Sequence, residues 1–211
     1  ADIYLRSMDC LQRGFAGGKW KKTQAKVRVI AQDNYAVMAM TGDNSQNFTA
    51  GWVVANGNIL RKTKNSKRDL CLIYRTGEMV TLKAAQIDHK KITDEMDQLW
   101  QSFLFGPVLL DENGKAMTKF NTNVGPANPR SVIGYYEPGH YCLVQVDGRR
   151  TESRLEKGKI NVGMTMKQTS ALMEQLGCAA AYNLDGGQSS VLWYNGENLS
   201  NPYNGGRNVM D

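Results

Sequence analysis

The pattern of apolar and polar positions predicts about ten short strands, most of them paired in hairpins. Apolar runs of four to eight residues alternate with polar turns, which is typical of strands rather than of long helices. The hairpin signals include Asn56-Gly57 and the four-residue turn 75–78. Strands are expected at residues 27–30, 35–40, 51–55, 58–61, 70–74, 79–82, 108–110, 130–136, 141–146, 179–184 and 191–194.

Two stretches show helical spacing instead. In the first, Met96, Leu99, Trp100, Phe103 and Leu104 would share one face of a helix that begins near Asp94 and ends at Gly106-Pro107. The second is expected to begin at Thr165 and end at Gly177.

In the second stretch, Thr165 and Gln168 form a capping box and Met166, Leu172 and Met173 supply apolar positions. Together the elements predict an α+β fold, one domain over residues 1–211 with a mixed or largely antiparallel sheet.

The stretch from Cys178 to Val191, CAAAYNLDGGQSSV, carries the strongest functional signal. An apolar run ends abruptly at Asp185-Gly186-Gly187, where paired glycines allow backbone N–H groups to approach a ligand closely. A carboxylate, free amides and the hydroxyls of Ser189 and Ser190 can bind an oxyanion and handle a proton. The alternative is a hairpin turn, for which Asp-Gly is a common signal.

Three aspartates share this context, because Asp43, Asp147 and Asp185 each follow a predicted strand and lie close to a glycine. Each alone is typical of a turn, but three strand ends of one sheet can converge on one edge. Arg130, Arg149 and Arg207 lie in similar polar segments. Arginine presents a planar fork that matches phosphate or carboxylate, although most arginines in proteins are simply solvated.

The composition narrows the class of protein. Hydrophobic content of 41% in 211 residues suits a globular domain, and no stretch approaches 18 uninterrupted apolar residues. The net charge of +6 gathers in clusters at residues 19–26 and 61–68, which are interpreted as solvated faces. Neither has the aromatic interleaving of a nucleic-acid site, so no nucleic-acid partner is expected.

The first residues are Ala-Asp-Ile, without an initiator Met. We interpret the chain as a processed form that has lost an export signal or anchor, and expect an extracellular or envelope-attached protein.

Cysteine and histidine positions do not indicate a metal site. Cys71, Cys142 and Cys178 lie in apolar segments and are expected in the core, while His89 and His140 are expected at the surface. No cofactor is predicted, and the sequence does not address a divalent cation.

Seven segments, in order along the chain, carry short motifs. They are residues 39–43 (AMTGD), 51–57, 105–107 (FGP), 128–134 (NPRSVIG), 146–149 (VDGR), 183–190 (NLDGGQSS) and Asn201-Pro202 with Arg207. Together they resemble the phosphodiester glycosidase family, whose members include exported bacterial proteins. The segments at residues 128–134, 146–149 and 183–190 are the most specific. The resemblance covers residues 35–211, and Thr41, Asn44 and Gln188 depart from the family pattern.

The resemblance implies hydrolysis of a sugar-1-phosphodiester to a free sugar and a phosphomonoester. It places Asp185, Asp43 and Asp147 as candidate catalytic residues, with Asp185 or Asp43 as base or nucleophile at the anomeric carbon. Phosphate and sugar would be bound by arginines, loop amides and hydroxyls. The predicted substrate-binding residues are Gly42, Arg130, Ser131, Arg149, Gly186, Gly187, Gln188, Ser189, Ser190, Asn201 and Arg207.

The leading functional hypothesis is therefore a hydrolase acting on glycosyl phosphates of cell-envelope or exopolysaccharide glycans. Two alternatives are a non-catalytic glycan-binding module on the same scaffold and a conventional glycoside hydrolase. The partner in each case is a carbohydrate.

Overall fold

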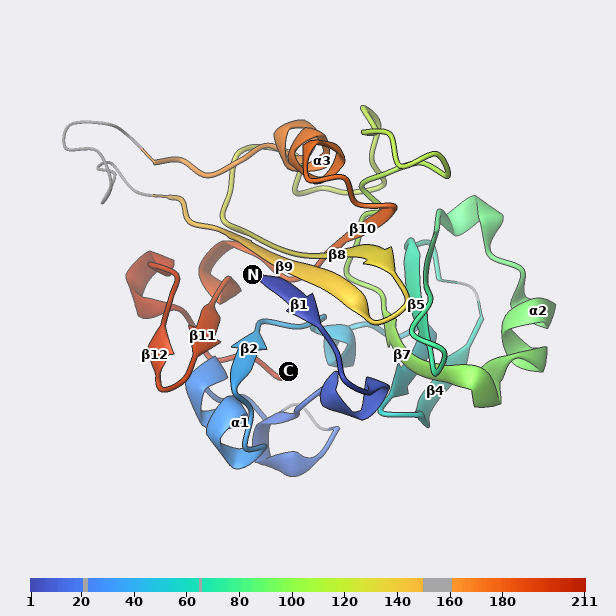
Figure 1. Cartoon of the computed structure of the whole chain (residues 1–211), viewed down its shortest axis with the longest axis horizontal. Helices are drawn as coiled ribbons and strands as arrows, with labels where there is room; N and C mark the ends of the chain where they lie inside the picture. Colours follow the sequence, from blue (N-terminus) through green and yellow to red (C-terminus); the bar gives the residue numbers. More distant parts are fainter. Residues whose placement is uncertain (21–22, 65, 150–160) are drawn as a thin grey trace.

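A central antiparallel sheet lies in the middle of the molecule, with helical and strand layers packed around it (Figure 1). The computed structural model describes residues 1–20, 23–64, 66–149 and 161–211, so Lys21, Lys22 and Asn65 of the two basic clusters lie outside the described residues. The strand order of the central sheet is β1 (Asp2–Tyr4), β9 (His140–Val146), β8 (Arg130–Glu137) and β10 (Ala180–Asn183).

Three smaller sheets surround the central one. The first has the order β6 (Met79–Leu82), β5 (Leu70–Tyr74), β7 (Leu99–Phe103), and the second pairs β3 (Gly51–Ala55) with β4 (Asn58–Thr63). The third has the order β12 (Glu197–Asn198), β11 (Leu192–Tyr194), β2 (Met38–Met40). All the strand pairs described are antiparallel, which confirms the predicted α+β class with a largely antiparallel architecture.

Side chains of the central sheet alternate between two apolar layers, as the pleat of a strand requires. Ile133, Tyr141 and Tyr182 pack with Cys71 and Phe103 from β5 and β7. Their sequence neighbours face the other way, toward α3 (Met166–Gln175), which lies across the opposite face of the sheet (Figure 1). The sheet is thus buried on both sides, and its residues are held in register by packing as well as by hydrogen bonds.

Much of the predicted local structure is confirmed. The hairpins β3–β4, β5–β6 and β8–β9 form where the turn signals place them. Helix α3 begins with the predicted capping box, in which the Thr165 hydroxyl accepts from Gln168 N and the Gln168 side chain accepts from Thr165 N.

The strand predicted at residues 27–30 is wrong, because this segment is helix α1 (Val27–Asp33). Its β-branched residues favour a strand locally. The buried positions are Val27, Ile30 and Ala31, which are spaced as on one face of a helix and pack against Val191 and Trp193. Tertiary packing therefore overrides the local preference.

The helix predicted from Asp94 to Leu104 is also wrong. The segment ends in strand β7, all of whose residues are buried, including Gln101 and Ser102. A strand covered on both faces shows no alternation, so its continuous apolar pattern can match a helical one. The helix that does form is α2 (His89–Asp94), which Asp88 caps by accepting from the N–H groups of Lys90 and Lys91.

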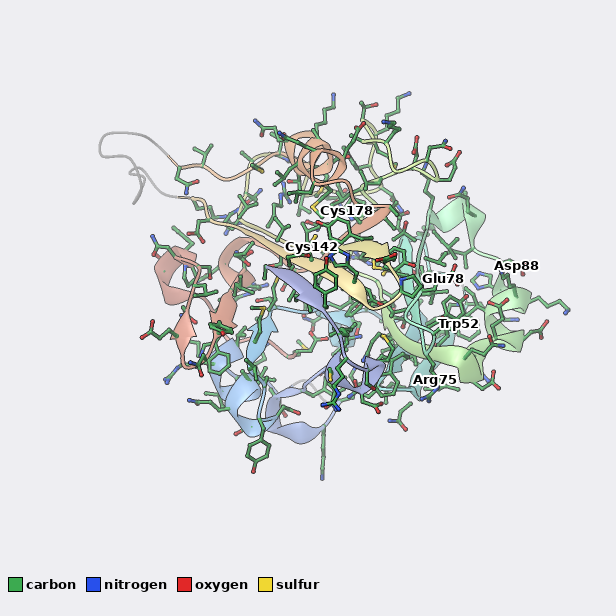
Figure 2. The ribbon with its side chains drawn as sticks, viewed as in Figure 1. Trp52, Arg75, Glu78, Asp88, Cys142 and Cys178 are labelled. Atoms are coloured by element: carbon green, nitrogen blue, oxygen red, sulfur yellow. The ribbon has the colours of Figure 1, made fainter. Side chains whose placement is uncertain are left out.

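Gly134 sits at the centre of the sheet between two thiols. Cys142 and Cys178 are buried, and their sulfurs lie 3.6 Å apart over this position (Figure 2). A Cβ at residue 134 would lie 2.6 Å from Cys142 Sγ and 2.8 Å from Cys178 Sγ. Only glycine leaves room for both sulfurs, which confirms the core location predicted for these cysteines.

We expect Gly134→Ala to destabilise the protein by about 1–3 kcal/mol, because overpacking a full core forces its neighbours apart. Denaturant unfolding measures the change. Gly125→Ala is the matched control, since a Cβ there meets nothing within 4 Å and should leave the free energy of unfolding nearly unchanged. Equal stability of the two variants would contradict the packing argument.

Candidate active site

The antiparallel register brings three strand termini to one edge of the central sheet. Arg130, the first residue of β8, pairs with Val146 at the end of β9, and the end of β10 lies beside the same part of β8. Leu184 N donates to Ser131 O at 2.8 Å, so the Asp185 loop begins beside the start of β8. Segments near residues 130, 149 and 185 therefore meet although they are far apart in the sequence.

A cavity of about 260 Å³ opens where these segments meet. Its wall combines three arginines and one carboxylate with loop backbone and two apolar side chains. The lining residues are Phe105, Val124, Asn128, Arg130, Arg149, Asp185, Gly186, Gly187, Gln188 and Arg207.

Asp185 is the one carboxylate among the described lining residues, and its side chain is only 8% exposed. Arg207 donates from Nη2 to Asp185 Oδ2 at 3.2 Å and from Nε to Ser189 Oγ at 2.5 Å. Burial raises the pKa of Asp185, while hydrogen bonding to Ser189 and the charge of Arg207 oppose the rise. The carboxyl is thus fixed in place and made more basic than an exposed one.

Arg130 and Arg149 form the cationic side of the cavity. Arg130 is 2% exposed and donates to the carbonyl oxygens of Met164 and Pro126, which hold it without neutralising its charge. Burial, and then the charge of Arg149, lower the pKa of Arg130 to about 10, so it remains protonated at neutral pH. Among the described residues, neither arginine has a carboxylate within ion-pair distance. Two guanidiniums without acidic partners are suited to binding an anion.

Asn128 and the glycines set the position of Arg149. Arg149 Nε donates to Asn128 Oδ1 at 3.0 Å. Gly187 has a φ of +62°, and a Cβ there would lie 2.9 Å from Arg149 Nη2. The glycine therefore allows the guanidinium to lie directly against the loop. Gly187 N donates to Pro129 O at 3.0 Å, so this amide, predicted to contact phosphate, already has a backbone partner.

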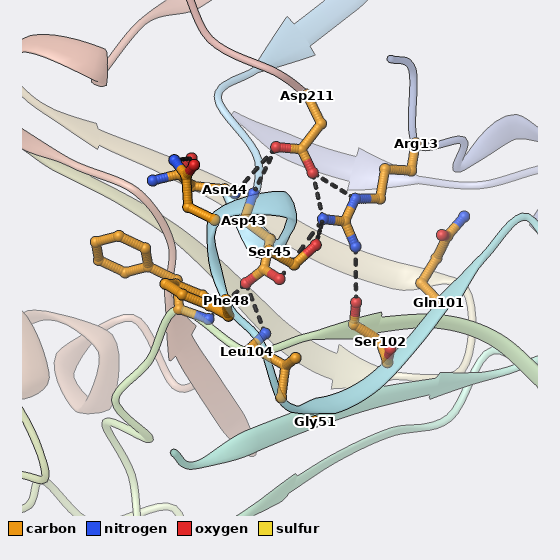
Figure 3. A network of polar contacts seen from close by, with 12 residues as sticks. Arg13, Asp43, Asn44, Ser45, Phe48, Gly51, Gln101, Ser102, Leu104 and Asp211 are labelled. Carbon is orange, nitrogen blue, oxygen red and sulfur yellow. Dashed lines mark hydrogen bonds and ion pairs between the residues drawn. The ribbon is translucent and has the colours of Figure 1, made fainter. Parts of the chain in front are cut away.

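Asp43 lies outside the cavity, in a fully buried polar cluster with Arg13 and Asp211 (Figure 3). Asp43 Oδ1 accepts from the N–H groups of Leu104 and Phe105 at 2.6 and 2.5 Å. Arg13 Nη2 lies 3.5 Å from Asp43 Oδ2 and forms a closer ion pair with Asp211. This side chain, predicted as a candidate catalytic residue, contacts the backbone that leads into the cavity rather than the cavity itself.

Asp147 likewise contacts backbone. Both of its oxygens accept from Asn201 N, at 3.0 and 2.9 Å, which fixes the 199–202 loop beside the end of β9. Ser131 and Ser190 are buried and lie 2.9 Å apart, Oγ to Oγ, with Gln145 Nε2 donating to Ser190. None of these side chains lines the cavity.

Gly42 supports the Asp185 loop through its backbone. Its carbonyl accepts from Asp185 N at 3.0 Å, and its N–H donates to Asp211 O at 3.1 Å. It connects the buried cluster to the loop that carries the carboxylate.

The sequence analysis did not identify Phe105, Val124 or Asn128 as residues of the cavity. It also did not identify Arg13 and Asp211, which form the buried cluster with Asp43. Phe105 and Asn128 belong to the segments that resemble the family, so a signal existed for those two. Arg13 is a single arginine in a glycine-rich stretch, and only the fold shows that it meets Asp211.

The basic cluster at residues 61–68 is not simply solvated. Arg61 donates to the carbonyls of Gly51, Ser45 and Ala50, and Arg68 lies over the Phe48 ring at 3.8 Å. Both arginines hold the 45–51 loop in place.

The described part of the chain contains neither a metal-binding cluster nor a membrane-spanning helix. Residues 1–20, 23–64, 66–149 and 161–211 contain no group of three or more His, Cys, Asp or Glu side chains arranged to bind a metal ion. None of the helices in these ranges has the length and apolar character needed to cross a membrane.

Comparison with known proteins decides the family. The model of the phosphodiester glycosidase family matches residues 27–211. The chain belongs to this family. No curated protein sequence matches it.

Solved structures share the fold at low sequence identity. The catalytic domain of zebrafish N-acetylglucosamine-1-phosphodiester alpha-N-acetylglucosaminidase, auto-inhibited by its pro-peptide, matches with a TM-score of 0.68 and 20% identity. A hypothetical protein from Synechocystis and a protein from Burkholderia pseudomallei named as exported match with TM-scores of 0.57 and 0.54, each at 13% identity.

The matches differ in how much of each protein they include. They cover 96%, 100% and 100% of this chain, but 66%, 55% and 70% of the respective proteins. This family member thus spans about two thirds of the zebrafish structure.

The buried cluster predicts a pH-dependent stability. Two carboxylates face one guanidinium, and burial raises the pKa of Asp43 from 3.8 to about 7. At a pH between these two pKa values, the Asp43 carboxyl is protonated in the folded state and ionised in the unfolded state. The free energy of unfolding therefore falls as the pH rises from 4 to 7. We expect Asp43→Asn to flatten this dependence in denaturant unfolding between pH 5 and 8.

Asp33→Asn, at an exposed position on α1, is the control and should keep the wild-type slope. An unchanged slope in Asp43→Asn would mean that another group releases the proton.

Proposed function

We propose that the protein hydrolyses a glycosyl phosphodiester, binding the phosphate at Arg130 and Arg149 and acting on the anomeric carbon with Asp185. The observation that carries this proposal is the juxtaposition, in one cavity, of one buried carboxylate and two arginines that have no acidic partner among the described residues. Family membership over residues 27–211 supports the same reaction class.

The charge distribution suits departure of a phosphate. When the bond between the anomeric carbon and the phosphate oxygen breaks, the bonding electrons leave with the phosphomonoester and its negative charge increases. The guanidiniums of Arg130 and Arg149 stabilise that charge most strongly as it forms. Their hydrogen bonds to backbone and Asn128 hold them in position beforehand, so little reorganisation is needed during the reaction.

One carboxylate is sufficient for such a leaving group. Most glycosidases use two, one of which protonates the leaving oxygen, but a phosphomonoester leaves without that proton. Asp185 can take a proton from the attacking water or attack the anomeric carbon itself. Direct attack by water gives an inverted product and a covalent intermediate gives a retained one, so the anomer first seen by proton NMR distinguishes the two roles.

The proposed substrates are glycosyl phosphates of cell-envelope or exopolysaccharide glycans, and the proposed location is extracellular or at the envelope. Similarity to a Burkholderia protein named as exported supports the location. The basic net charge of +6 is compatible with an anionic polymer as substrate.

We expect Asp185→Asn to lower kcat for a glycosyl-1-phosphodiester by about 10²- to 10⁴-fold, because the variant lacks the group that handles the proton. Release of free sugar measures the rate, and Asp33→Asn should match the wild type. In the wild type, the acid limb of kcat/KM should lie at higher pH than for an exposed aspartate, since burial raises the pKa of Asp185. Full activity of Asp185→Asn would remove this residue from the mechanism.

Arg149→Gln should raise KM for the phosphodiester about tenfold or more, because a charge-assisted hydrogen bond to phosphate is worth roughly 1.5–3 kcal/mol. The control is Arg28→Gln, at an exposed position on α1, which should keep the wild-type KM.

A matched aryl glycoside without phosphate distinguishes the proposed function from the two alternative functions. Its cleavage would indicate a conventional glycoside hydrolase, and binding of both compounds without turnover would indicate a glycan-binding module.

A further inference from the structure

A second cavity shares a wall with the first. It has a volume of about 160 Å³, and Asp185 and Arg207 line both cavities. Their ion pair, with Nη2 to Oδ2 at 3.2 Å, therefore lies at the boundary between the two. A water molecule takes about 30 Å³ in the liquid, so the second cavity has room for a ligand of several heavy atoms.

The two cavities differ in the chemistry of their walls. Arg130 and Arg149 line only the first. The second is lined by four carboxamide side chains, and Asp185 and Arg207 are the sole charged groups among its described lining residues. The carboxamides belong to Gln24, Asn44, Asn47 and Asn208. Because an amide both donates and accepts hydrogen bonds, such a wall matches neutral hydroxyl groups rather than an anion.

Two of these amides are held in a defined orientation. Asn47 Nδ2 donates to Asn44 Oδ1 at 2.7 Å, and Asn44 adopts a left-handed backbone with φ of +54°. Asp211 Oδ1 accepts from Asn44 N at 3.0 Å, which ties this turn to the buried cluster of Asp43 and Arg13. Among the described residues, Asn44 Nδ2 and Asn47 Oδ1 have no further hydrogen-bond partner, leaving a donor and an acceptor for a ligand.

We propose that the second cavity binds the sugar of the substrate as a neutral pyranose ring, so that the substrate spans the Asp185–Arg207 pair with its phosphate in the first cavity. This inference rests on the proposed function and adds the orientation of the substrate. In a glycosyl phosphate the anomeric carbon joins sugar to phosphate, and the boundary between the cavities is where Asp185 lies.

The test measures binding without turnover. Methyl pyranosides (gluco, galacto, manno and N-acetylglucosamine) and inorganic phosphate are titrated separately into the full chain, with backbone amide resonances followed by NMR. A methyl pyranoside should shift resonances of Asn44, Asn47 and Asn208, and phosphate should shift those of Arg130, Gly187 and Gln188. Phosphate shifts confined to the second cavity, or no sugar-induced shifts there, would overturn the proposal.

Variants separate the two cavities. Asn44→Gly keeps the left-handed backbone, which glycine adopts freely, and should weaken pyranoside binding about tenfold while leaving phosphate binding unchanged. Arg130→Gln should do the reverse. The matched control is Asn198→Ala, at an exposed position on β12, which should bind both ligands as the wild type does. Unchanged pyranoside binding in Asn44→Gly and in Asn47→Ala would overturn the proposal.

The same experiment distinguishes failure here from failure of the proposed function. If both ligands bind as expected but no glycosyl phosphodiester is hydrolysed, the sugar site stands and the hydrolase does not. If hydrolysis occurs but neither Asn variant changes pyranoside binding or KM, the hydrolase stands and the assignment of the second cavity is wrong.

Discussion

The register of β8 against β9 and β10 is the constraint on which the site depends. Pairing Arg130 with Val146, and Asn183 with Val132, brings the start of one strand and the ends of two others to the same edge. Because side chains alternate along a strand, a slip of one residue would turn Arg130 away from the cavity and expose the apolar face of the sheet. Packing on both faces, by α3 and by β5 with β7, makes such a slip costly, so the same apolar side chains that stabilise the fold also position the charged ones.

Arg130, Arg149 and Asp43 are each held by neutral hydrogen-bonding groups, whereas Asp185 is held by an ion pair with Arg207. Carbonyl oxygens hold Arg130, an asparagine holds Arg149, and the amides of Leu104 and Phe105 hold Asp43. Neutral partners fix a cation without cancelling its field, so the two arginines stay available to an anion. The buried cluster differs, since there Arg13 faces both Asp43 and Asp211. Burial, and to a smaller extent the charge of Asp211, raise the pKa of Asp43 to about 7, while the charge of Arg13 and the two backbone hydrogen bonds oppose the rise.

The sequence predicted the hairpins and the capped helix α3, because each depends on local signals. It also expected the strand ends before Asp43, Asp147 and Asp185 to converge on one edge of one sheet. Only the last two belong to the central sheet, since β2, before Asp43, lies in another. The sequence misassigned α1 and β7, where the three-dimensional surroundings decide which pattern is buried. It also treated three aspartates as equivalent, whereas Asp185 lines the cavity and Asp43 and Asp147 bind backbone N–H groups. A carboxylate after a strand has the same local sequence in either role, and only the fold determines what it faces.

The ion pair between Arg13 and Asp211 joins residues 198 positions apart in the sequence. Closing so long a loop contributes to a high contact order, which generally slows folding. It also means that the turn carrying Asn44 acquires its anchor only after residue 211 has left the ribosome. A chain without Asp211 would therefore contain every described strand but lack the support beneath its reaction centre.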